Sequence, residues 1–94
     1  MRKFEKFELI NFLESLDSES SENKEFVLCE KDKEKLILQA NFFGGALSCG
    51  VFKQDEFEEV ESLDFNTIVA KNSFQLKNEV VSYVADFVKE FLED

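Results

Sequence analysis

Residues 26–54 of this chain read FVLCEKDKEKLILQANFFGGALSCGVFKQ and contain three apolar runs, separated by the charged turn KDKE at 31–34 and the glycine pair at 44–45. Every second position of the middle run is apolar, which is the pattern of a strand with one buried face. These alternating residues are Leu36, Leu38, Ala40 and Phe42. The two turns predict reversals of the chain, and Gly50 inside the third run indicates a bulge or a close approach of another group. The stretch therefore predicts a meander of three antiparallel strands.

Helical periodicity flanks this central region on both sides. Residues 3–16 place apolar side chains at helical spacing and predict a first amphipathic helix. The polar, serine-rich residues 17–25 end this helix and predict an exposed connection. Residues 73–92 predict a long last helix, with Asn72 or Ser73 as its N-cap. Its expected apolar face consists of Val80, Val81, Val84, Phe87, Val88, Phe91 and Leu92.

Residues 57–71 admit two interpretations. The β-branched residues Thr67, Ile68 and Val69 favour one or two further strands, while the acidic part is also compatible with a helical turn; we expect strands. The order of elements then predicts an α+β fold, in which an antiparallel sheet of three to five strands (a meander) carries an N-terminal and a long C-terminal helix. Residues 1–94 are expected to form a single domain.

The composition indicates a folded, strongly acidic protein. Of 94 residues, 44% are hydrophobic and 12 are Phe, which excludes a disordered acidic tail. The formal net charge of −10 disfavours direct binding to nucleic acid or to anionic membranes and favours a basic protein partner. The alternative is that this charge serves solubility alone.

The sequence also predicts a cytoplasmic location. The N-terminus lacks the small-residue cleavage pattern of a secretory signal. No apolar run approaches the roughly 20 residues that a membrane-spanning helix needs. Cys29 and Cys49 lie in apolar runs, where a buried free thiol is expected in a reducing compartment rather than a disulfide.

Catalytic chemistry finds little support in the sequence. There is no His, which removes His-assisted nucleophiles, His metal sites and the usual acid and base at neutral pH. Cys29 and Cys49 lack C-x-x-C spacing, and no glycine-rich phosphate loop is present. A calcium loop starting at Asp17 fails, because Glu22 and Leu28 occupy the positions that need Gly and Glu. No pair of carboxylates stands out for hydrolysis. We therefore expect no enzyme activity, no cofactor and no metal.

The most acidic stretch, DEFEEVESLD at residues 55–64, is the candidate site for binding a partner. It contains six carboxylates and no basic residue. Phe57, Val60 and Leu63, spaced three apart, are expected to pin the segment to the domain or to supply an apolar anchor. The predicted partner-binding residues are Asp55, Glu56, Phe57, Glu58, Glu59, Glu61 and Asp64. The alternative is a solvated segment without a partner.

The plan of the whole chain resembles the small immunity proteins that bacteria make against their own toxins, many of which are nucleases. The likeness rests on FEKFELINFLESL at 4–16, on the FVLCE and KLILQANFF strand pair, on DEFEEVESLD, and on VVSYVADFVKEFLED at 80–94. It lies in the general plan, so it assigns no role to a single residue. The resemblance implies a tight one-to-one complex with a cognate toxin in the cytoplasm of the producing cell.

Two other functions remain open at the level of sequence. One is a phage-type nucleic-acid mimic that inhibits a DNA-binding protein or a CRISPR or restriction nuclease, and the other is a non-catalytic adaptor. A mimic is expected to space its carboxylates along a face in the manner of phosphates. A toxin inhibitor can mix acids with aromatic anchors, and Phe57 among the acids favours it.

Overall fold

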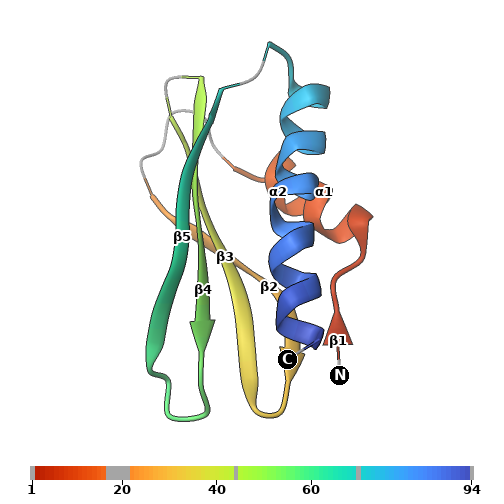
Figure 1. The fold of residues 1–94 in the computed structure, drawn as a ribbon. Helices are drawn as coiled ribbons and strands as arrows, with labels where there is room; N and C mark the ends of the chain where they lie inside the picture. The colour runs from red at the N-terminus through yellow and green to blue at the C-terminus, as the bar shows by residue number, and fades with distance from the viewer. Residues whose placement is uncertain (1, 17–21, 44, 70, 94) are drawn as a thin grey trace.

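The computed structural model describes residues 2–16, 22–43, 45–69 and 71–93. Its elements are, in order, β1 (Arg2–Lys3), α1 (Lys6–Glu14), β2 (Lys24–Lys31), β3 (Glu34–Phe43), β4 (Ala46–Gln54), β5 (Val60–Val69) and α2 (Ser73–Glu93). Each strand pairs antiparallel with the next, so the sheet order is β1-β2-β3-β4-β5. Both helices pack on one face of this sheet (Figure 1). The predicted α+β fold, a meander sheet with two helices on it, is confirmed.

The turns between the long strands follow the residues that the sequence offers. Asp32 and Lys33 both have positive φ, 51° and 67°, which is the backbone of a two-residue hairpin turn that suits the twist of β2 and β3. Gly45 takes φ 81° in the next reversal, where a side chain would be strained. Its neighbour Gly44 lies outside the described residues.

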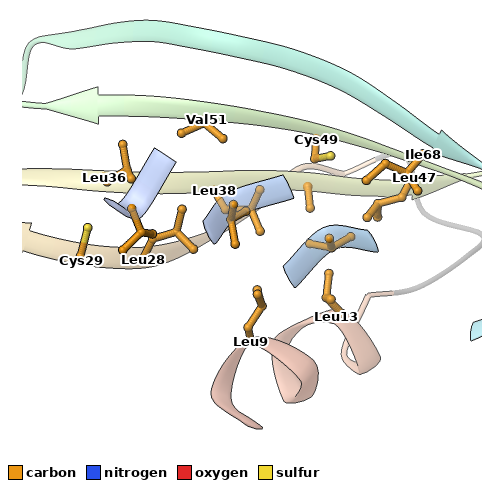
Figure 2. Close-up of a cluster of buried hydrophobic side chains, with 14 residues drawn as sticks. Leu9, Leu13, Leu28, Cys29, Leu36, Leu38, Leu47, Cys49, Val51 and Ile68 are labelled. Atoms are coloured by element: carbon orange, nitrogen blue, oxygen red, sulfur yellow. The ribbon is translucent and has the colours of Figure 1, made fainter. Parts of the chain in front are cut away.

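The core lies between the sheet and the helices (Figure 2). The predicted alternation along β3 is confirmed, since Leu36, Leu38 and Ala40 are completely buried and Phe42 packs against them. The rest of the buried cluster comes from all the longer elements: Leu9, Leu13, Leu28, Cys29, Leu47, Cys49, Val51, Ile68, Val80, Val84 and Val88. Both cysteines are buried free thiols, as expected. Burial of this apolar surface is the main favourable term in folding.

The first helix is shorter than predicted. Lys3 lies in β1, opposite Cys29, and the Phe4 N–H donates to the Leu28 carbonyl at 2.8 Å, so pairing with β2 prevents this part of the chain from being helical. The Glu8 side chain accepts the Glu5 N–H at 3.1 Å and marks the start of α1.

The connection predicted over 17–25 is also shorter. Lys24 and Glu25 belong to β2, because their backbones pair with Ala40 and Gln39 of β3. Residues 17–21 lie outside the described part of the chain.

The two interpretations of residues 57–71 are resolved in favour of a strand. β5 is one ten-residue strand that pairs with β4 along its length, with a register shift between Val51 and Phe52. It forms an edge of the sheet, and its residues other than Ile68 are exposed.

The last helix is confirmed, with Asn72 as its cap. The Asn72 Oδ1 accepts the Gln75 N–H at 2.8 Å. Three valines of α2, Val80, Val84 and Val88, are buried in the core, whereas Phe87 and Phe91 pack beside the core and remain partly exposed. Neither of the described helices is both long and apolar enough to cross a membrane.

Candidate functional site

The predicted site falls on the connection between β4 and β5 and on the first half of β5; we call residues 55–64 the acidic hairpin. The Asp55 N–H donates to the Glu59 carbonyl at 3.0 Å and closes the loop. The Asp55 carboxylate accepts two N–H groups of the same loop, from Phe57 at 2.9 Å and from Glu59 at 3.0 Å. Glu58 takes positive φ, 64°, at the tip. Asp55 therefore shapes the loop that presents the other acids.

Two further acids of the hairpin form exposed ion pairs. The Lys33 Nζ lies 3.4 Å from the Glu56 Oε2. The Lys53 Nζ lies between two carboxylates, 3.7 Å from the Glu61 Oε2 and 3.9 Å from the Glu34 Oε2. Exposed pairs of this kind contribute about 0–1 kcal/mol to stability. A cation of a partner can therefore compete for these carboxylates at little cost.

Asp64 lies apart from the other predicted residues. The Tyr83 hydroxyl donates to the Asp64 Oδ2 at 2.8 Å, so this carboxylate faces α2. Burial raises the pKa of Tyr83 above its ordinary value, and the hydrogen bond to Asp64 raises it further. Asp64 thus links β5 to the last helix, and the structure brings together Asp55 to Glu61 without it.

The apolar residues of the hairpin do not hold it to the core. Phe57 is 77% exposed, Val60 is 58% exposed and Leu63 is 40% exposed. Their spacing of three would gather them on one side of a helix, but in a hairpin it separates them. The expectation that they pin the segment is wrong, and the role of an exposed apolar anchor remains for Phe57.

A hollow of about 310 Å³ opens beside the hairpin. It is lined by Glu34, Lys53, Asp55, Glu59, Val60 and Glu61. Four carboxylates around one ammonium group leave this hollow negative, which suits a Lys or Arg side chain of a partner. In the part of the chain that the structure describes, no group of His, Cys, Asp or Glu is placed to hold a metal ion.

Sequence reasoning missed Glu34 and Lys53, which belong to β3 and β4. The pairing of Lys53 with Glu61 follows directly from the β4–β5 register, so a predicted hairpin turn at 55–59 would have revealed it. Comparison with protein families, with curated proteins and with solved structures gives no match for this chain.

Proposed function

We propose that this protein is a small acidic inhibitor, an immunity protein that binds a cognate bacterial toxin and neutralises it by covering a cationic active site. The observation that carries the proposal is the acidic hairpin, which exposes Glu58 and Glu59 around the 77% exposed ring of Phe57. A nuclease suits this description of the toxin, because a surface that binds phosphates is cationic. The inhibitor acts in the cytoplasm of the producing cell and needs no catalytic chemistry.

The net charge of the protein and the ring of Phe57 contribute to different steps of binding. The net charge of −10 accelerates the encounter with a cationic surface and suppresses encounters with acidic proteins. Phe57 then supplies an aromatic anchor of the kind that dominates binding energy at protein interfaces. The negative hollow between Glu34, Glu59 and Glu61 receives a basic side chain beside that anchor.

The arrangement supports a toxin inhibitor better than a nucleic-acid mimic. Asp55 accepts hydrogen bonds within its own loop, and Asp64 accepts one from the Tyr83 hydroxyl. The six carboxylates therefore do not form an evenly spaced row. An exposed Phe between Glu56 and Glu58 has no counterpart in a phosphate backbone.

Co-expression tests the proposal. The protein is produced in a bacterial host together with the product of its neighbouring gene, and growth and copurification are measured. We expect that product to be toxic alone, to be neutralised by this protein and to copurify with it. Changing Phe57, Glu58 and Glu59 to Ala, Gln and Gln should abolish rescue, whereas Phe74→Ala, which alters an equally exposed ring on α2, should not. A non-toxic neighbour, or rescue that survives the triple change, would contradict the proposal.

A further inference from the structure

The face of the sheet opposite the helices has no role in the proposed binding by the acidic hairpin. The strand registers define the residues that share it. We call this the open face; among the residues whose side chains are described, it consists of Glu25, Val27, Glu30, Lys35, Ile37, Gln39, Asn41, Ala46, Ser48, Gly50, Phe52, Gln54, Val60, Ser62, Phe65, Thr67 and Val69. Neither of the two described helices lies on it (Figure 1).

The composition of the open face differs from that of the whole chain. Among the residues that the structure describes, its positions on β4 and β5 include no charged side chain, although 34% of the chain is charged. Large apolar side chains are exposed instead: Val27 is 40% exposed, Val60 58%, Phe65 66% and Val69 74%. Few charges together with exposed apolar side chains, one of them aromatic, is the composition of the centre of a protein interface.

A hollow of about 210 Å³ lies within the open face; we call it the apolar hollow because Ile37, Phe52 and Val60 are among its lining residues. Its lining residues are Glu25, Ile37, Gln39, Phe52, Gln54 and Val60. Ile37 is buried although it is not part of the core cluster, so it forms the floor of the hollow.

Beside the apolar hollow, the packing of two aromatic rings depends on Gly50. A Cβ added there would lie 3.0 Å from the Phe52 ring and 3.1 Å from the Phe65 ring, so both rings pack over the glycine backbone. The absent side chain lets the two aromatic residues approach each other across β4 and β5.

The open face and the acidic hairpin meet at Val60. Val60 lines both the apolar hollow and the negative hollow beside Glu59 and Glu61. Lys53 and Glu61 are in register with the buried Leu36 and so lie on the helix side of the sheet, not in the open face. Within the open face, Glu25 lines the apolar hollow and provides a carboxylate for a basic side chain bound beside it.

We infer that the open face is the docking surface for a cationic protein, which places an apolar side chain in the hollow above Ile37 and a Lys or Arg side chain against Glu25. The inference rests on the proposed function and adds to it the docking surface and the chemistry of the partner segment. Charge decides between this occupant and a second copy of the chain. Two copies would each bring a net charge of −10, and the open face on β4 and β5 offers no described cation to offset it.

Isoleucine methyl labelling tests the inference, because the chain contains three isoleucines in three different environments. Ile37 lies under the open face, Ile68 lies in the core and Ile10 lies on α1. The probe is a synthetic peptide in which lysine alternates with valine and phenylalanine, added to the full-length protein. We expect the Ile37 methyl signal to shift while those of Ile10 and Ile68 do not. The same peptide with glutamate in place of lysine should cause no shift.

Two matched variants test whether the peptide binds to the open face. Thr67→Arg adds bulk and positive charge at an exposed position of the open face, and Ser82→Arg makes the same charge change at an exposed position of α2. We expect the first to weaken peptide binding about tenfold or more and the second to change it by less than about twofold.

Three results would overturn the inference: no binding of the basic peptide, binding that shifts only the Glu58 and Glu59 amides and leaves Ile37 unchanged, or a concentration-dependent dimer that Thr67→Arg dissociates. The proposed function fails independently of these results. A neighbouring toxin that copurifies equally well with Thr67→Arg would refute the docking surface and leave the inhibitor intact, whereas the absence of a toxin refutes the inhibitor.

Discussion

The Asp55 carboxylate accepts hydrogen bonds from the backbone N–H groups of Phe57 and Glu59. In this short loop the carboxylate replaces the backbone carbonyls that would accept such bonds in regular secondary structure. We expect Asp55→Ala to destabilise the protein by about 1 kcal/mol, since exposed hydrogen bonds of this kind contribute modestly. Asp55→Asn keeps the acceptor oxygen and should cost less. Urea denaturation of both variants measures the difference, and equal losses would show that the charge of Asp55, not its role as an acceptor, is what matters.

The two buried thiols predict how stability depends on pH. Burial raises the pKa of Cys29 and of Cys49 from 9.0 to about 11. Unfolding lowers both values again, so the unfolded chain loses these protons first as the pH rises. The stabilisation is fully present below pH 9 and is lost as the pH rises toward 11. Thermal melts between these pH values should show a steeper fall for the parent than for Cys49→Ala, and parallel curves would exclude the thiol as the cause.

The apolar residues of α2 share one helical period but differ in how deeply they are buried. Phe87 is partly exposed and packs edge-to-face on Tyr83 at 5.4 Å between ring centroids, while the core positions on α2 are held by valines. We expect Phe87→Ala to cost about 2 kcal/mol, below the roughly 3–5 kcal/mol of a fully buried Phe. Phe74→Ala, at a ring on the same helix that is 76% exposed, is the control and should leave the melting temperature unchanged. A melt of Phe87→Ala that matches the parent would remove Phe87 from the packing of α2.

Elements with a strong period could be predicted from the sequence. The alternation around Leu38 gives β3, and the spacing of Val80, Val84 and Val88 gives α2, because each pattern repeats over many residues against one core. The start of α1 could not be predicted in the same way. Residues at its N-terminal side pair with β2, and this contact depends on a strand that lies more than 20 positions further along the chain.

The candidate site was harder to predict than the fold. Residues 55–64 were singled out by charge, and apolar spacing suggested a pinned segment, whereas hydrogen bonds to Asp55 set the shape of the loop. The sequence did not indicate that the partly exposed Phe52 and the exposed Phe65 share a face of the sheet. Their positions follow from the β4–β5 register, which the sequence fixes only once the ends of the loop are known.

At the scale of the whole molecule, the sheet divides the protein into a helix side and an open side, and the acidic hairpin lies at one end of the sheet (Figure 1). The β2–β3 turn, the acidic hairpin and the last turn of α2 lie together at that end (Figure 1). The Lys31 Nζ donates to the Leu92 carbonyl at 3.1 Å and joins two of these parts. The C-terminal end of a helix adds partial negative charge to its surroundings. We expect a cationic partner to be attracted toward the acidic hairpin.

Removing the charge of the hairpin tests whether it steers the partner. Glu58, Glu59 and Glu61 are exposed, and Lys53 keeps its pair with Glu34 when Glu61 is lost, so replacing all three by Gln should change stability by less than about 0.5 kcal/mol. Association with the cognate partner should slow by about tenfold at low salt, and the rate should depend less on salt, because both effects come from long-range attraction. Stopped-flow association at several salt concentrations measures both quantities.

A control with the same net charge separates local from overall attraction. Glu22→Gln, Glu79→Gln and Asp86→Asn together remove three negative charges from exposed positions outside the acidic hairpin. Attraction by the net charge of −10 alone would slow both triple variants equally. At about 0.1–0.15 M salt, where the Debye length is about 8–10 Å, attraction toward the acidic hairpin should slow the hairpin variant several-fold more than the control variant. If both variants associate at the parent's rate at low salt, the hairpin is a solvated segment and the partner binds elsewhere on the molecule.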